Sequence, residues 1–198
     1  MGAIFQSLGR TITAGVVLLV IFIILAGLGT GSWVRAGDHA WWTFFMRWLH
    51  VLSGVMWIGL LWYFNFVQTP SMPKIPDEQK PAVSKVIAPT ALFWFRWAAM
   101  ATIVTGLLLA WMNGYIGQAL GLQKPFTAIG LGMWFGIVMW FNVWFIIWPN
   151  QKKALGMVTV PAEEKTKAAR MAMLTSRFNT MLSVPMLYLM VAQQNGGL

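Results

Sequence analysis

Long apolar stretches, separated by short segments that carry most of the charge, constrain this chain more than any other feature. A helix of about 20 residues rises about 30 Å, which matches the hydrocarbon core of a bilayer. Such a helix also satisfies its backbone hydrogen bonds internally, as lipid requires. Five stretches are predicted to be transmembrane helices, at about residues 12–33, 41–67, 90–112, 127–148 and 178–194.

The composition supports a membrane protein rather than a soluble one. Of the 198 residues, 58% are hydrophobic and 10% are charged, whereas soluble domains carry about 25% charged residues. Pro161 suits the first position of a helix, so we predict that residues 161–177 are helical and continue into the last stretch. The predicted fold class is an all-α bundle of about five transmembrane helices, forming a single domain over residues 1–198.

The basic residues are distributed unevenly between the segments that connect the predicted spans. With five spans, ten basic residues fall on the side of the N-terminus and two on the other, which predicts a cytoplasmic N-terminus and a periplasmic C-terminus. The ten are Arg10, Lys74, Lys80, Lys85, Lys152, Lys153, Lys165, Lys167, Arg170 and Arg177, and the two are Arg35 and Lys124. Topology and anionic lipids then explain the net charge of +9, and no nucleic acid is expected as a partner. The predicted location is the bacterial inner (cytoplasmic) membrane, which the chain crosses several times.

Several kinds of site are excluded by residue type. The chain has no cysteine, which rules out disulfides, thiolate zinc sites, iron–sulfur clusters and covalently attached c-type haem. All five acidic residues lie outside the predicted spans, so no pair of carboxylates is expected for acid–base chemistry. No catalytic residue is predicted, and we do not expect the chain to be an enzyme on its own.

His50 is the residue most able to carry chemistry, because it lies inside the second predicted span. An ionisable group at that depth is costly unless it is paired, and is therefore a functional candidate. Arg47 lies one turn nearer the outer surface and Gly54 one turn deeper on the same face. This pattern suits a haem whose iron binds His50, whose propionate meets Arg47 and whose ring passes Gly54. The alternative is structural: Arg47 extends towards the interface and His50 hydrogen-bonds to a neighbouring helix.

Counting residues inward from each membrane surface places Met186, Met133, Val104 and Thr105 near the same depth as His50. Either methionine is a candidate second ligand, because His/Met pairs hold haem iron in some proteins. In a methionine-rich bundle, packing is the more common role. Haem b is therefore the cofactor considered first, with a chlorophyll-type pigment as the alternative, since magnesium needs only one axial ligand.

Four stretches together resemble the urate oxidase N-terminal membrane domain family, the membrane part of cytochrome-c-linked urate hydroxylases. They cover about residues 41–194 in order, and are 47–59, 93–97 with 105–106, 147–152, and 176–180 with 182–185. The resemblance carries over Arg47 and His50. Members of the family typically have a histidine where this chain has Phe178, and full-length members continue into a cytochrome c, which a chain without cysteine cannot contain.

Three functions are consistent with these observations. The first is an accessory, non-catalytic membrane subunit of a respiratory or photosynthetic electron-transfer complex, which would bind other membrane subunits and anionic lipids. The second is a haem-binding redox module that uses His50 and passes electrons to a periplasmic cytochrome c. The third is the membrane domain of a urate hydroxylase, an oxidoreductase.

Overall fold

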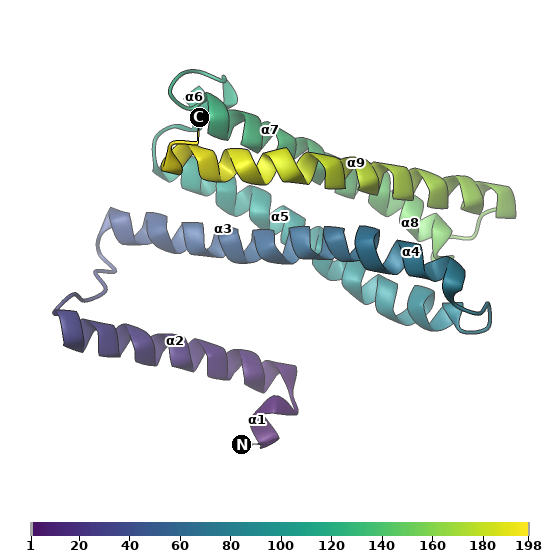
Figure 1. Cartoon of the computed structure of the whole chain (residues 1–198), viewed down its shortest axis with the longest axis horizontal. Helices are drawn as coiled ribbons and strands as arrows, with labels where there is room; N and C mark the ends of the chain where they lie inside the picture. The colour runs from purple at the N-terminus through teal and green to yellow at the C-terminus, as the bar shows by residue number, and fades with distance from the viewer. Residues whose placement is uncertain (1, 198) are drawn as a thin grey trace. The chain divides into compact units, whose positions relative to one another are not determined.

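A computed structural model of the chain describes residues 2–197, and all regular secondary structure in that range is helical (Figure 1). The predicted all-α class is thereby confirmed. The contacts divide the chain into two compact units, Met1–Phe44 and Phe45–Leu198. Each unit is described by itself.

The first unit contains a short helix α1 (Gly2–Phe5), the long helix α2 (Leu8–Thr30) and the beginning of α3 (His39–Trp62). The apolar run without Pro makes α2 continuous over 23 residues. Gly31 ends it in a left-handed conformation (φ 68°) and donates its backbone N–H to the carbonyl of Gly27. Gly27 also leaves room for the ring of Trp33, since a Cβ there would lie 2.7 Å from that ring.

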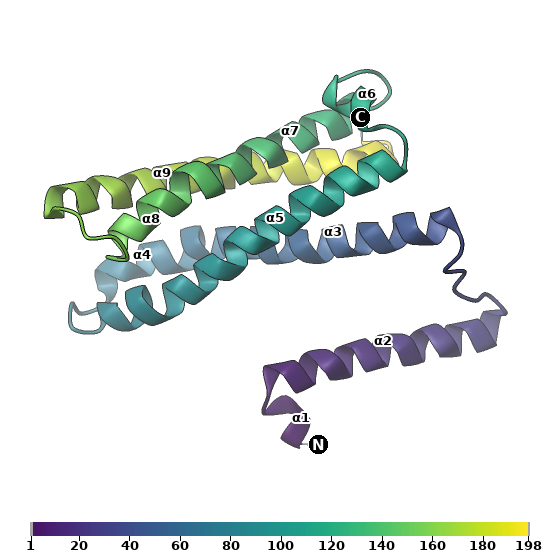
Figure 2. The same ribbon diagram turned by 180° about the vertical axis from the view of Figure 1, so that it is seen from behind.

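The second unit consists of long helical rods joined by short connections, and both views place α7 beside α9 (Figures 1 and 2). Its elements are the rest of α3, the π-helix η1 (Tyr63–Gln68), α4 (Thr69–Ser71), the 3₁₀-helix η2 (Met72–Lys74), the π-helix η3 (Ala82–Ile87), α5 (Ala88–Met112), α6 (Ile116–Leu120), α7 (Thr127–Phe141), the π-helix η4 (Asn142–Ile147), α8 (Trp148–Ala154) and α9 (Ala162–Asn195).

A proline follows each π-helix, with one residue between the end of the helix and the proline. The prolines are Pro70 after η1, Pro89 after η3 and Pro149 after η4. A proline has no N–H to donate and its ring collides with the carbonyl four residues earlier, which in all three cases belongs to the π-helix. The wider π turn relieves that collision and keeps the rod continuous. The second predicted stretch therefore continues helically to Lys74, beyond its expected end at residue 67.

Four helical segments are long and apolar enough to cross a membrane, which indicates a multi-pass membrane protein. They are Leu8–Thr30, His39–Lys74, Ala82–Met112 and Thr127–Ala154, and they contain or overlap the first four predicted stretches. The helix α9 runs unbroken for 34 residues and includes both the predicted helix 161–177, apart from its first residue, and the stretch 178–194. A fifth crossing by α9 stays a prediction.

Buried amide and hydroxyl groups tie α9 to the other rods. Asn142 donates its side-chain amide to Asn179 at 2.8 Å, and Asn179 donates to the backbone carbonyl of Met139 at 2.9 Å. Asn179 and the nearby Ser183 are fully buried. Two more bonds join α9 to the rod of α3 and η1, from Asn65 to Ser176 (2.8 Å) and from Trp62 to Ser183 (3.0 Å). Such interhelical bonds fix the register and rotation of α9 in the second unit.

Candidate functional site

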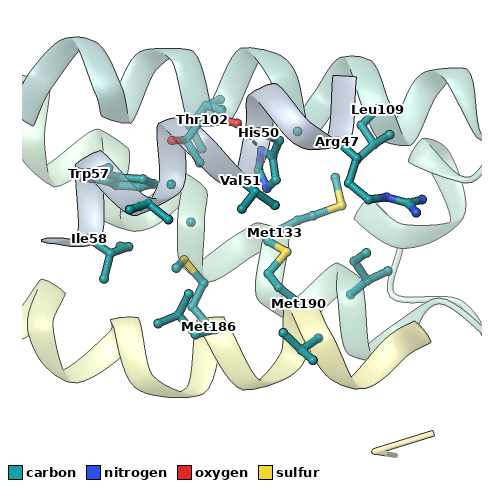
Figure 3. Close-up of a pocket in the computed structure, with 18 of the residues that line it drawn as sticks. Arg47, His50, Val51, Trp57, Ile58, Thr102, Leu109, Met133, Met186 and Met190 are labelled. Atoms are coloured by element: carbon teal, nitrogen blue, oxygen red, sulfur yellow. Dashed lines mark hydrogen bonds between the residues drawn. The ribbon is translucent and has the colours of Figure 1, made fainter. Parts of the chain in front are cut away.

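A cavity of about 620 Å³ lies within the second unit, lined by residues of α3, α5, α7 and α9 (Figure 3). Its volume falls within the range of about 300–1,000 Å³ that is usual for small-molecule sites. Most lining side chains are apolar, and polar groups reach it from a few positions only. The cavity therefore suits a mainly apolar ligand that a few polar groups orient.

His50 enters the cavity lining from α3 and is held by α5. Its Nδ1 lies 2.9 Å from the backbone carbonyl of Thr102 and 3.3 Å from the hydroxyl of Thr105. Because a carbonyl can only accept, Nδ1 carries the proton and donates it. Nε2 then keeps its lone pair, and no bond to Nε2 occurs among the described residues. His50 thus combines one anchored nitrogen with one nitrogen that is open to a ligand, as metal-binding histidines do.

Gly106 allows the ring of His50 to approach α5 so closely. A Cβ at Gly106 would lie 2.8 Å from Cε1 and 3.1 Å from Nδ1 of His50. Gly54 leaves open space on α3, where a Cβ would meet only a Thr102 methyl at 4.0 Å. The sequence suggested Gly54 as room for a ring, whereas the role of Gly106 became visible only in the structure.

Three methionines line the cavity together with His50. Met186 and Met133 are 5% and 9% exposed, and Met190 lies one turn beyond Met186 on α9. Figure 3 shows their thioethers around the cavity beside the ring of His50. The depth argument predicted Met186 and Met133 at this level, and the structure places both in the lining of the same cavity.

Polar groups gather at one part of the lining: Arg47 of α3, Tyr115 after α5, and Gln194 and Asn195 at the end of α9. Arg47 is exposed, whereas Tyr115 is partly buried and stacks on Phe126 with ring centroids 4.9 Å apart. Burial raises the pKa of the Tyr115 phenol, and the positive charge of Arg47 opposes that rise. The cavity is therefore amphipathic, with a cation available for the acidic groups of a ligand.

The structure brings together the three residues singled out for cofactor binding, Arg47, His50 and Met186, in the lining of one cavity. It also shows the structural role considered for His50, a hydrogen bond to a neighbouring helix, but only through Nδ1. Ligation of iron by His50 stays a prediction. Tyr115 and Thr102 were not predicted from the sequence, because their roles depend on how α5 is rotated.

Phe178 lies apart from this cavity. It is 46% exposed and borders a smaller cavity of about 330 Å³. The other residues of that smaller cavity are Asn142, Ile146, Leu174 and Thr175. The replacement of the family's histidine by Phe178 therefore removes no group from the lining around His50.

Within residues 2–197, no three side chains of His, Cys, Asp or Glu lie close enough to hold a metal ion. A tetrapyrrole brings ring nitrogens as ligands for its metal, so it would need only one or two ligands from the chain, such as His50 and a thioether. The open Nε2, the glycines and the cation of Arg47 all fit such a group.

The family model described as urate oxidase N-terminal matches residues 116–196. The chain matches no curated protein and no solved structure. The match contains Met133 and Met186 but begins after Arg47 and His50. The resemblance of residues 41–115 therefore stays a prediction. Residues 116–196, which form α6 to α9, are therefore similar to the urate oxidase N-terminal family.

Proposed function

We propose that the second unit is a membrane redox module that binds a b-type haem through His50. The observation that carries the proposal is the arrangement of His50, whose Nδ1 donates to the Thr102 carbonyl while Nε2 is left for a ligand beside a cavity of about 620 Å³. A carbonyl partner fixes the tautomer and ring orientation and makes the imidazole a stronger ligand. When bound, a haem would supply one-electron transfer.

The other lining residues have distinct roles in this proposal. The guanidinium of Arg47 would pair with a propionate carboxylate through a charge-assisted hydrogen bond. Gly54 and Gly106 keep side chains away from the face of α3 and from the ring of His50. The buried Trp57 and Ile58 line the apolar part. A water-poor lining of this kind influences the reduction potential.

Met186 is the thioether that would supply a second ligand to the haem iron. It is nearly buried, and its sulfur lies 3.7 Å from where a Cβ of Gly136 would stand. The thioether therefore lies directly beside Gly136 of α7. His/Met ligation raises the reduction potential of haem iron, which suits transfer to a soluble cytochrome.

Five crossings complete the proposal. The hydrogen bonds of Asn179 and Ser183 bury polar groups of α9 against other rods, which supports α9 as a membrane-crossing helix. Five crossings and the distribution of basic residues give a cytoplasmic N-terminus in the bacterial inner membrane. The polar part of the cavity, with Arg47 and Tyr115, then faces the periplasm, where a cytochrome c could exchange electrons with the haem.

Absorption spectroscopy on the purified chain tests the proposal directly. Protein expressed with a haem supply should show a Soret band, split α and β bands on reduction, and a pyridine haemochrome of the b type. Protein that takes up no haem, even on titration with hemin, would refute it.

A second candidate is the accessory subunit of an electron-transfer complex, and a specific observation favours it. Large aromatic side chains are exposed along α5 and at the end of α7, including Trp94 (52%), Trp97 (50%) and Phe141 (48%), and could meet another membrane subunit. Stable purification with a partner complex, and without haem, would support this candidate instead. A urate hydroxylase has less support, because the lining holds one cationic side chain, Arg47, and no carboxylate.

A further inference from the structure

Two cations share one indole ring where α5 meets α8. The guanidinium carbon of Arg96 lies 3.3 Å from the ring centroid of Trp148, and the ammonium of Lys152 lies 5.6 Å from the same centroid. Arg96 also lies 6.0 Å from the ring of Trp144. Stacking of this kind holds the guanidinium by its flat face. Its N–H groups point outward in the plane of the guanidinium and are not used by the stacking.

Two of the three guanidinium nitrogens lack partners within residues 2–197. Nε and Nη1 of Arg96 are buried without a hydrogen bond. The ion pairs in the same residues involve other cations, and join Lys80 to Asp77, Lys153 to Glu164 and Lys167 to Glu163. Arg96 and Lys152 therefore form a doubly positive cluster without a counter-ion, inside or next to membrane-crossing helices, where an unpaired charge is costly.

The surface beside this cluster is aromatic and exposed. Phe93 and Trp97 lie on α5, one turn before Arg96 and directly after it, and are 48% and 50% exposed. Trp97 makes an edge contact with Trp144, whose centroid lies 5.5 Å away. An acyl chain can lie along such a surface while an anionic group meets the cations. A free phosphate or a water-soluble acidic protein has no acyl chain to bury against this aromatic surface.

We propose that Arg96, Lys152 and Trp148 form a binding site for the phosphate of an anionic phospholipid, whose acyl chain lies along Phe93 and Trp97. The ammonium of Lys152 would donate hydrogen bonds to the phosphate oxygens. The buried guanidinium of Arg96 would attract the phosphate by its charge, and the indole would hold the two cations side by side. The site is separate from the cavity of His50 and does not depend on haem. With a cytoplasmic N-terminus, it faces the cytoplasmic leaflet, where anionic lipids are common.

Lipid retention by the full chain tests this site. Purified chain in mild detergent is mixed with phosphatidylglycerol or phosphatidylcholine, and the bound lipid is counted by native mass spectrometry. We expect preferential retention of phosphatidylglycerol. Arg96→Gln and Lys152→Gln should each weaken it about fivefold, the usual effect of one basic residue at an anionic surface. Lys74→Gln is the matched control, since it removes an exposed charge from the same predicted side and should leave retention unchanged.

Four results would overturn the proposal. The first is equal loss in the Lys74→Gln control, which would mean that overall charge attracts the lipid. The second is displacement of the lipid by millimolar inorganic phosphate, which would mean a simple anion site. The third is full retention by Lys152→Gln, which would mean that the ammonium of Lys152 does not contribute to binding. The fourth is a protein that copurifies with the wild-type chain but not with Arg96→Gln, in the absence of bound lipid.

Discussion

Replacing Gly106 by alanine tests the geometry that holds His50. The added Cβ would stand 2.8 Å from Cε1 of His50, whereas ordinary contact begins at 3.4 Å. The ring therefore has to move by about 0.6 Å, the difference between those two distances. The hydrogen bond from Nδ1 to the Thr102 carbonyl, now 2.9 Å, then stretches or breaks.

The expected effects on stability and on haem binding differ. Losing one interhelical hydrogen bond costs about 0.6 kcal/mol on average in a membrane protein, and replacing a mid-helix glycine by alanine gains about 0.5–1 kcal/mol. The two nearly cancel, so the free energy of unfolding should change little. Disturbing the partner of a metal-binding histidine typically lowers metal affinity about 10–100-fold. Haem affinity should therefore fall while the fold persists.

Hemin titration of the apo-protein, followed at the Soret band, measures the affinity, and unfolding in denaturing detergent measures the stability. Gly15→Ala is the control, because it makes the same change within α2, where a Cβ meets nothing within 4 Å. An affinity for haem in Gly106→Ala equal to that of Gly15→Ala would refute the proposed anchoring of His50.

His50→Ala should abolish the Soret band of reconstituted protein, whereas His39→Ala should leave it intact. A Soret band that survives His50→Ala would mean that another residue binds the iron. Met186→Leu, a swap of similar volume, should retain haem but lower its midpoint potential in a redox titration, because a thioether ligand raises that potential; an unchanged potential would exclude Met186 as a ligand. Reporter fusions should read as periplasmic at the C-terminus and as cytoplasmic within residues 161–170, and two reports from the same side would mean an even number of intervening crossings.

The depth of the site could be predicted from the sequence because the rise of a helix is fixed at 1.5 Å per residue. Counting inward from the predicted surfaces brought Met186, Met133 and Thr105 to the level of His50. The structure places both methionines in the same lining and the Thr105 hydroxyl 3.3 Å from Nδ1. The position of each residue along its helix axis could therefore be predicted without knowing how the helices pack.

Rotation about the helix axis could not be predicted in the same way. Hydrophobic residues surround α5 on all sides, so no amphipathic face indicates which side meets α3. Whether Thr102 and Gly106 face His50 depends on this rotation. The π-helices were also missed, because the sequence shows only the prolines, Pro70 among them, and a proline predicts a helix end as readily as a widened turn.

The position of Phe178 changes the weight of the competing functions. From the sequence alone, the missing histidine argued against a haem, because no other predicted span offered a second histidine. In the structure, Phe178 borders a different cavity from His50, so the two positions need not serve one iron. A histidine at 178 would stand near Asn142 rather than near the thioethers of Met133 and Met186. The absence of that histidine therefore does not change the set of side chains that line the cavity around His50.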